Sequence, residues 1–196
     1  MNGTGLPLRE NCPAAVLLDE DYSAAAGGQC IASYENLTEL AGKAMKRKRS
    51  LIRQFGTACK SFGFEEITHQ NIDAAFDVER LWQGDDADGE AAFVRRCFRS
   101  FHEMKLMGGI LLTDQKAVGY SIAAPCTETG ALILVLRAKP IPAGASAMLY
   151  RQTALLLRRR LPKLELINLG CCGGDAELQN RLAYRPMVQN FTQDTI

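Results

Sequence analysis

Hydrophobic positions follow two different periods along the chain from residue 64 onwards. Short stretches alternate between apolar and polar residues, or are apolar throughout, as strands are, and turn sequences bound them. Two of these stretches flank the turn Asp-Gln-Lys at 114–116 and predict an antiparallel hairpin. The expected strands are 64–68, 108–113, 117–124, 131–137, 164–170 and 186–192.

Segments with the helical period of about 3.6 residues follow the expected strands 64–68, 131–137 and 164–170. In one of them, four apolar residues form a single stripe: Phe93, Cys97, Phe101 and Met104. The polar, glycine-flanked segment 84–89 is typical of a linker. The expected helices are 71–82, 90–105, 143–161 and a short helix from Asp175 to Leu182. The order is a strand, two helices, three antiparallel strands, a helix, a strand, a helix and a strand.

One long amphipathic helix is expected before the first of these strands, over residues 36–62. Asn36 is suited to cap its start, with Glu39 three residues later, and Gly63 ends it. On a helical wheel, one face of this segment is apolar and the other is cationic. Lys48 falls in the middle of the apolar face.

Glycine and proline residues interrupt the first 33 residues repeatedly, and only 15–18 has the pattern of a short strand. We expect this segment to be a remnant or an adaptor. The chain is thereby divided into three parts, namely the segment 1–33, a basic linker helix over 34–63 and a sheet domain over 64–196.

Composition is that of a globular protein, with 47% hydrophobic and 23% charged residues in a chain of 196. The 23 basic and 22 acidic residues give a net charge of +1, so total charge points to neither nucleic acid nor a membrane surface. The longest apolar run, 131–136, is far shorter than the about 20 residues that span a bilayer. Since the start of the chain has no secretory leader pattern, we expect a cytoplasmic protein.

Cysteine and histidine usage argues against a metal centre. The seven cysteines contain no Cys-x-x-Cys pair, Cys171 and Cys172 are adjacent, and His69 and His102 are the only histidines. We therefore expect reduced thiols and no bound metal. A thiol nucleophile at 171–172 would need a base, which neither histidine is placed to supply.

Lys48 is a candidate binding residue because of its predicted place on an apolar face. Desolvating an ammonium group is costly, so a buried lysine shifts its pKa or binds an anionic partner. Lys48 then contacts a carboxylate or a bound anion at the base of a cleft that Asn168 also lines. Alternatively, its apolar stem lies on the core and its charged head reaches solvent.

Two clusters of positive charge stand out. Six cations lie between Lys43 and Arg53, which suits RNA or lipid phosphates but is also typical of a solvated helix face. No aromatic platform is interleaved with them, so base stacking is not supported. The second cluster, 158–160, lies at a helix C-terminus, where it complements the helix dipole.

Two more positions are candidates for binding. The loop 140–146, which contains Gly144 and Ser146, precedes a helix and is either an anion site on backbone N–H groups or a tight turn. Asn168 ends an otherwise apolar strand, and a buried amide there needs a partner, either a substrate or a neighbouring loop.

Four groups of motifs make residues 34–196 resemble a known family. They are YENLTEL with GKAMKRKRSLIRQF, GGILLTDQKAVGYSIAAP, the loop 140–144 with the helix start GASAM, and INLG followed by LAYRP. The chain resembles the phosphatidylglycerol lysyltransferase C-terminal-like family, as an N-terminally truncated member. The resemblance implies an α/β (α+β) GNAT-like fold, with a mixed, mostly antiparallel sheet flanked by helices and preceded by the long basic helix.

The resemblance also implies a function. It implies transfer of an acyl or aminoacyl group, with aminoacyl-tRNA or acyl-CoA as donor and with tRNA or an anionic phospholipid headgroup as partner; it leaves the acceptor open. Lys48 and Arg49 match the family's Lys-Arg pair, and Arg185 in LAYRP either binds a phosphate or pairs with Asp175. No catalytic residue follows from it. The implied substrate-binding residues are Lys48, Arg49, Gly144, Ser146, Asn168 and Arg185.

The chain departs from the family pattern at three places. Ser50 replaces the asparagine that follows the Lys-Arg pair, and the sequences LRAK and LGCCGGD replace segments that carry acidic residues. Gln179 stands where acyl-CoA enzymes of this fold often have a tyrosine acid, which argues against ordinary acetyl-CoA chemistry. These departures leave a second hypothesis open, a non-catalytic GNAT-like module that binds an anionic ligand or a protein partner.

Overall fold

The computed structural model describes residues 17, 29–80, 90–171, 181, 183–184 and 187–189, and in this part of the chain seven strands form one sheet. Their order across the sheet is β2-β3-β4-β5-β6-β1-β7, and every neighbouring pair is antiparallel except β5 and β6. The strands are β1 (Gln29–Ser33), β2 (Phe62–Glu66), β3 (Met107–Thr113), β4 (Lys116–Pro125), β5 (Gly130–Ala138), β6 (Leu166–Cys171) and β7 (Met187–Gln189).

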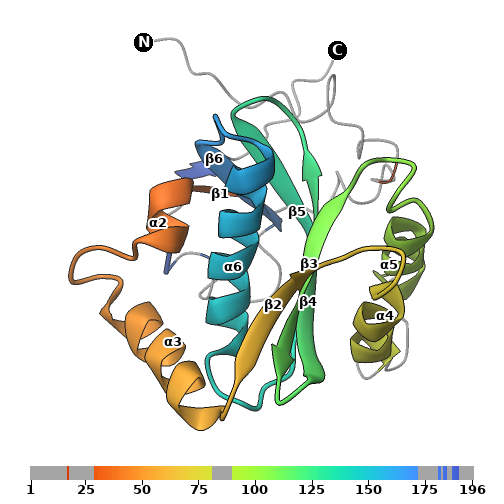
Figure 1. Ribbon diagram of the computed structural model, residues 1–196. Helices are drawn as coiled ribbons and strands as arrows, with labels where there is room; N and C mark the ends of the chain where they lie inside the picture. Colours follow the sequence, from red (N-terminus) through yellow and green to blue (C-terminus); the bar gives the residue numbers. More distant parts are fainter. Residues whose placement is uncertain are drawn as a thin grey trace, which may run out of the picture.

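Helices cover both faces of the sheet, as Figure 1 shows. On one face lie α2 (Tyr34–Thr38), α3 (Lys46–Ala58) and α6 (Ala145–Arg160). On the other lie α4 (Ile72–Arg80) and α5 (Glu90–Arg99), the helix pair expected between the first two strands of the 64–196 region. The mixed, mostly antiparallel sheet flanked by helices is thus confirmed, and so is the hairpin of β3 and β4.

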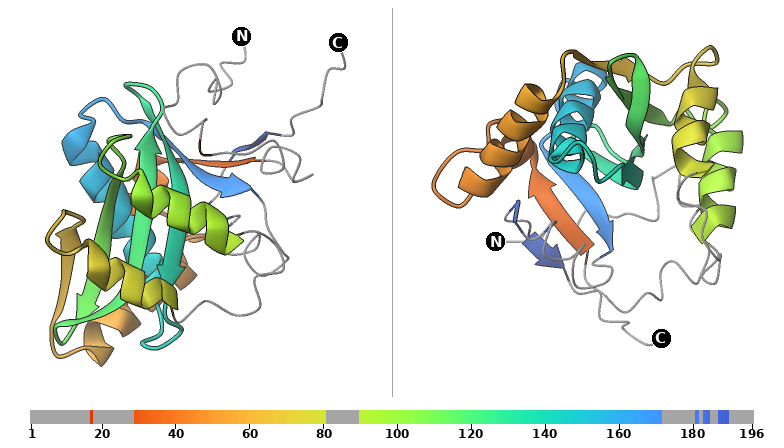
Figure 2. Two further views of the ribbon diagram at one scale, coloured as in Figure 1. Left: turned by 90° about the vertical axis from the view of Figure 1, so that its right-hand side faces the viewer. Right: turned by 90° about the horizontal axis from the view of Figure 1, so that it is seen from below.

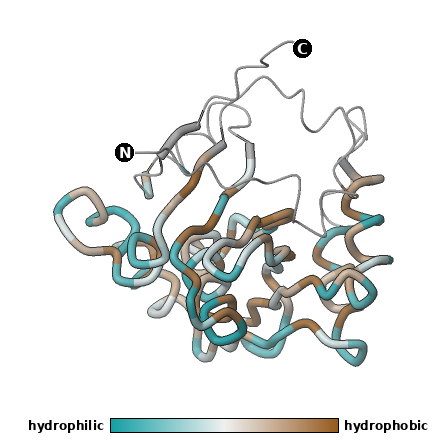
Figure 3. Tube along the Cα trace, turned by 90° about the horizontal axis from the view of Figure 1, so that it is seen from above, coloured by the Kyte–Doolittle hydropathy of each residue, from teal (hydrophilic) through white to brown (hydrophobic). Residues whose placement is uncertain are grey.

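Hydrophobic residues pack on both sides of the sheet because strand residues alternate between its faces. Leu132 and Ile122 pack with Phe93 and Val78 under α4 and α5. Ile133 and Ile167 pack with residues of α2 and α6 on the other face. Along α4 and α5, hydrophobic and hydrophilic residues alternate in Figure 3, as expected of helices that cover a sheet on one side only.

The expected continuous helix over 36–62 is wrong, because the chain leaves the helical conformation after α2 and resumes it at α3. Leu40 has a φ of 54° and Gly42 a φ of 81°, in the left-handed region that ends helices. The cap of α2 is also one turn earlier than expected, since the Ser33 side chain accepts a hydrogen bond from the Asn36 N–H at 3.1 Å. Strand β2 starts at Phe62, where the helix was expected to continue.

Strand β1 was not expected in the segment 1–33, yet it lies inside the sheet between β6 and β7. Figure 2 shows these three strands side by side at one end of the sheet. The boundary placed at residue 64 therefore leaves a sheet strand outside the expected sheet domain. Within 15–18 the structure describes only Leu17, in a turn, and nearly all of the helix expected at 175–182 lies outside the described residues.

Candidate functional site

Strands β5 and β6 pair over a short distance and then separate. Their parallel register covers Gly130 to Leu132 on β5 and Leu166 to Asn168 on β6, although β5 continues to Ala138. Asn168 is thus the last residue of β6 that pairs with β5 before the two strands separate. The backbone groups of β5 beyond Leu132 have no register partner on β6 in the described residues.

Asn168 is fully buried, and only one end of its amide is engaged. Its Oδ1 accepts a hydrogen bond of 2.8 Å from the Gly170 N–H. The backbone turns at Gly170, which has a φ of 90°. Its Nδ2 has no hydrogen-bond partner among the described residues. A buried donor without a partner is costly, so this amide is suited to donate to a bound molecule.

Lys48 is buried, with 3% of its surface exposed, as its place on the helical wheel predicted. Its ammonium lies 4.2 Å from the centre of the Tyr184 ring, a cation–π contact. Burial, and then the charge of Arg47, lower the pKa of Lys48 to about 8. The amine therefore stays mostly protonated near pH 7, but it releases its proton at a lower pH than an exposed lysine does.

Lys48 and Asn168 lie on opposite faces of the sheet. Ile167 and Leu169 pack in the same core as Tyr184, on the α6 face. Since neighbouring strand residues point in opposite directions, the side chain of Asn168 between them points to the α4–α5 face. One cleft lined by both side chains, as the sequence suggested, does not form in this arrangement.

Arg49 braces the loop between α2 and α3. Its guanidinium donates to the carbonyl oxygens of Leu40 and Gly42, the latter at 2.8 Å. These are the two residues with positive φ at the break in the expected helix. Arg49 therefore ties α3 to the backbone that precedes it, and it helps to position Lys48 one residue before it.

Gly144 and Ser146 lie at the start of α6, opposite α3. Gly144 has a φ of 89°, and no side chain caps the helix. A Cβ on Gly144 would overlap the backbone of Leu51, coming within 2.7 Å of its carbonyl carbon. This glycine is thus used for close helix packing, and the backbone N–H groups of Ser146 and Ala147 are the ones left for an anion.

Other residues singled out from the sequence fall outside the described part of the chain. Arg185, Gln179, Cys172 and Asp175 are among them, so Arg185 stays a prediction. The structure places the side chains of four cysteines, and it shows no disulfide bond among them; they are Cys30, Cys59, Cys97 and Cys126. No group of three or more acidic, cysteine or histidine residues within the described ranges is arranged to hold a metal ion.

A buried polar cluster on the α4–α5 face was not expected from the sequence. The Tyr120 hydroxyl donates to Glu79 Oε2 at 2.5 Å, and Arg137 Nε lies 3.7 Å from the same oxygen. Burial, the hydrogen bond to Glu79 and its charge raise the pKa of Tyr120 well above its usual value. The one signal in the sequence was Arg137 at the end of an apolar strand, where a charge needs a partner.

The comparisons with known proteins agree with this architecture. A family model described as "Phosphatidylglycerol lysyltransferase, C-terminal" matches residues 23–184. Among proteins with curated functions, none matches the chain. None of the helices in the described ranges is long and apolar enough to cross a membrane.

Solved structures show the same fold at low sequence identity. A conserved protein of unknown function from Bacteroides thetaiotaomicron superimposes with a TM-score of 0.74 at 24% identity, over 83% of this chain and 56% of that one. L-PGS from Bacillus licheniformis gives 0.56 at 14% identity, over 83% and 57%. A tandem GNAT protein from the clavulanic acid pathway gives 0.52 at 9% identity, over 83% and 50%. The fold is therefore GNAT-like, and the chain spans little more than half the length of these structures.

Proposed function

Because the chain belongs to the family of phosphatidylglycerol lysyltransferase C-terminal domains, we propose that it transfers an acyl or aminoacyl group to an amine or hydroxyl acceptor. The observation that carries the proposal is the buried Asn168 amide at the point where β5 and β6 separate. Its Nδ2 has no partner among the described residues, and the residue lies where the two strands separate.

Asn168 would act by stabilising charge. Attack of an amine or hydroxyl on an ester or thioester carbonyl places negative charge on the carbonyl oxygen, and a preorganised N–H donor lowers the energy of that state. The hydrogen bond that Oδ1 accepts from the Gly170 N–H fixes the orientation of the Asn168 amide before substrate binds. Such a mechanism works by positioning and by this donor, without a covalent intermediate.

The donor we favour is an aminoacyl ester, as on aminoacyl-tRNA, over acyl-CoA. A CoA pyrophosphate would need the glycine at the start of α6 for a close backbone approach. In this chain the Cα of Gly144 is already packed against Leu51 of α3, so the residues present do not form that cradle. An anionic phospholipid headgroup is the acceptor class that the family name supports.

Transfer of a labelled group tests the proposal. The protein is mixed with radiolabelled lysyl-tRNA or acetyl-CoA and with phosphatidylglycerol vesicles or free amines, and the labelled product is separated. Asn168→Asp keeps the acceptor for the Gly170 N–H and removes the Nδ2 donor. Loss of one oxyanion donor is expected to lower kcat about 10²–10³-fold. Asn36→Asp, the same change on α2, is the matched control.

The second hypothesis, a non-catalytic module that binds an anion, is favoured by one observation. The two residues that match the family's Lys-Arg pair are engaged inside the fold, Lys48 with the Tyr184 ring and Arg49 with the α2–α3 loop. Binding of labelled donor without any transfer, in wild type and in Asn168→Asp alike, would favour this hypothesis and refute the transferase proposal.

A further inference from the structure

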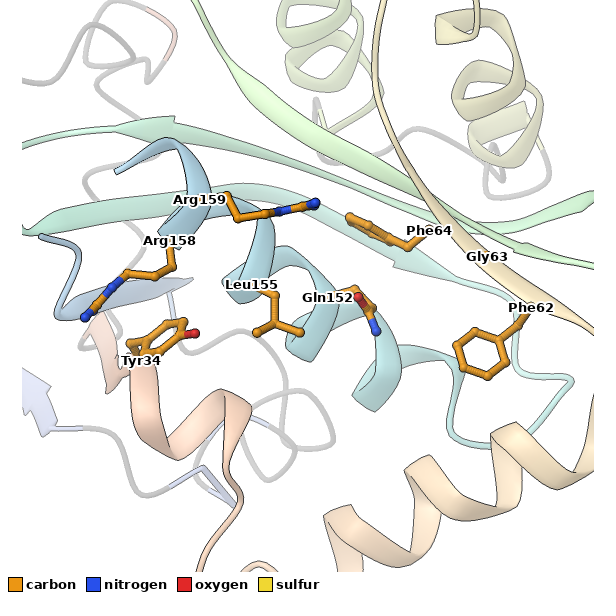
Figure 4. Close-up of a pocket in the computed structure, with 8 residues that line it drawn as sticks. All are labelled: Tyr34, Phe62, Gly63, Phe64, Gln152, Leu155, Arg158 and Arg159. Atoms are coloured by element: carbon orange, nitrogen blue, oxygen red, sulfur yellow. The ribbon is translucent and has the colours of Figure 1, made fainter. Parts of the chain in front are cut away.

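A groove of about 530 Å³ runs along the outward side of α6, between α2 and β2. Figure 4 shows its lining side chains spread along α6, with Tyr34 beside Arg158 at one end and Arg159 pointing toward Phe64 of β2. It lies on the α6 face of the sheet, whereas the Asn168 amide points to the other. The residues that line it are Tyr34, Phe62, Gly63, Phe64, Gln152, Leu155, Arg158 and Arg159.

The aromatic rings of β2 are held in place from behind and are accessible from the groove. Phe62 is 45% exposed, and its ring packs edge-on against Phe55 of α3, with 5.6 Å between the ring centres. The Phe64 ring lies over Gly109 of β3, where a Cβ would come within 2.8 Å of the ring carbon Cε2. Both rings are therefore fixed, flat apolar surfaces beside an open groove.

The cations at the end of α6 differ in what they contact. Arg158 lies 4.8 Å from the centre of the Tyr34 ring and donates to the Leu164 carbonyl oxygen. Arg160, beside the groove, forms a two-pronged ion pair with Glu66, at 3.0 and 2.7 Å. Arg159 is exposed and has no ion pair or hydrogen bond to any described residue. The groove thus offers one uncommitted guanidinium beside fixed aromatic rings.

We propose that this groove binds a nucleoside phosphate, with the base stacked on the β2 aromatic rings and the phosphate on Arg159. Stacking on aromatic side chains with a nearby cation is how proteins bind single-stranded nucleic acid without reading its sequence. No aromatic residues lie among the basic residues at 43–53. In the groove, by contrast, the rings of Phe62 and Phe64 lie near the basic cluster 158–160. The same chemistry fits a free nucleotide and a nucleotide of an RNA strand.

Flat rings and an open shape favour a nucleotide over a lipid in this groove. An acyl chain gains little from lying flat on rings that solvent also reaches, since its stabilisation depends on being buried. A nucleobase is stabilised by stacking on the face of an aromatic ring, and the phosphate of the nucleotide can accept a charge-assisted hydrogen bond from Arg159. The inference does not rest on the proposed transfer activity, because the groove and Asn168 lie on opposite faces of the sheet.

Fluorescence anisotropy of a labelled single-stranded RNA hexamer, titrated with the full chain at several salt concentrations, tests the proposal. Phe62→Leu is expected to weaken binding about tenfold through lost stacking and to leave the salt dependence unchanged. Arg159→Gln is expected to weaken binding and to reduce the slope of log Kd against log salt by about 0.7, the value for one single-strand phosphate contact. Phe64→Leu repeats the stacking test at the ring over Gly109.

Competition with AMP distinguishes the two sources of the ligand. Displacement of the hexamer by AMP indicates that a free nucleotide suffices, and binding of the hexamer without displacement indicates an RNA strand. Arg99→Gln, at an exposed arginine in the last turn of α5, is the matched control and should bind as wild type does. Thermal melting confirms that each variant is folded.

Three results would overturn the proposal. One is hexamer binding that neither Phe62→Leu nor Arg159→Gln weakens. Another is hexamer binding that Arg53→Gln, on the basic face of α3, weakens as much as the groove variants do. The third is binding of phosphatidylglycerol vesicles, weakened by the groove variants, with no binding of AMP or RNA.

Discussion

Gly144 at the start of α6 and Leu51 in the middle of α3 approach each other through their backbones, with no side chain between them. An added Cβ on Gly144 would lie 2.7 Å from the Leu51 carbonyl carbon and 3.3 Å from the Phe55 Cβ. Because glycine has no Cβ, Gly144 allows the backbone of α3 to cross the start of α6 at this short distance. This contact sets how the Lys48 end of α3 faces the sheet.

Gly144→Ala is therefore expected to lower the free energy of unfolding by about 2–4 kcal/mol, from the positive φ together with the backbone overlap. Gly56→Ala is the matched control, because Gly56 lies in α3 with nothing within 4 Å of an added Cβ. It is expected to be neutral or to stabilise by up to about 1 kcal/mol. Urea denaturation of both variants gives the comparison, and equal midpoints would contradict the close packing of α3 on α6.

Lys48→Met is expected to stabilise the protein near neutral pH. Burial, and then Arg47, lower the pKa of Lys48 to about 8 in the folded chain, below the ordinary 10.5. The unfolded chain therefore binds the Lys48 proton more tightly than the folded chain does. At pH values below both pKa values, this difference lowers the free energy of unfolding. Allowing for the contact with the Tyr184 ring, the gain in the variant is about 1–3 kcal/mol.

The stability gained by Lys48→Met over wild type is expected to depend on pH. Between the two pKa values the unfolded chain holds more protons than the folded one, so wild-type stability rises with pH over that interval. The difference between Lys48→Met and wild type should shrink as pH rises from about 8 to about 10.5. Urea midpoints across this range measure it. A constant difference would show that Lys48 is not desolvated, and lost anion binding in the variant would assign the lysine to a binding site.

The cluster of Glu79, Tyr120 and Arg137 is expected to be a major source of stability for the α4 side of the sheet. Arg137→Met leaves the Glu79 carboxylate buried without its cation, and breaking a buried pair costs about 3–5 kcal/mol. Tyr120→Phe removes one hydrogen bond to a charged group, a loss of about 1.5–3 kcal/mol. Both changes are read from urea unfolding curves.

An exposed pair on the same helix provides the control for that cluster. Arg80 contacts Asp77 at 3.2 Å, with both side chains largely in solvent. Arg80→Met should cost less than about 1 kcal/mol, as exposed ion pairs do. If Arg80→Met and Arg137→Met destabilise equally, the Glu79 cluster is not desolvated as the structure has it.

His69 and His102 stack with 3.3 Å between their ring centres and 20° between their planes. Desolvation, and then the neighbouring His69, lower the pKa of His102. His69→Gln is expected to raise the pKa of His102, which NMR titration of its ring protons measures. Because the unfolded chain binds the proton more readily, this histidine lowers wild-type stability as pH falls through about 6.5. An unchanged His102 titration in the variant would exclude the coupling.

The strands from β2 to β6 could be predicted because local patterns define them. The hairpin of β3 and β4 has two polar turn residues, Asp114 and Gln115, between its strands, and β5 begins with the apolar run 130–136. Lys48 could be placed on an apolar face by helical period alone. Its contact with Tyr184 could not, because that ring comes from a distant part of the chain that only the fold brings to α3.

The missed features depend on distant partners. Strand β1 is a short segment after a run of alanines and glycines, and it becomes a strand because β6 and β7 pair with it on both sides. The break after α2 had a local sign, Gly42, but the break also depends on Arg49, which holds the loop carbonyls from within α3. The Glu79 cluster joins three elements, and no single segment reveals it.

The position of β1 between β6 and β7 has a consequence for how the chain folds. Gln29 pairs with Gln189, so the last described strand completes the sheet only against one of the first, about 160 residues earlier. Contacts of such long sequence separation form slowly, because a large loop must close before they contribute. During synthesis, Gln29–Ser33 would stay unpaired until β6 emerges, and its other edge would stay unpaired until Met187–Gln189 emerge. A hydrogen-exchange pulse during refolding should therefore protect β3 and β4 early and β1 last.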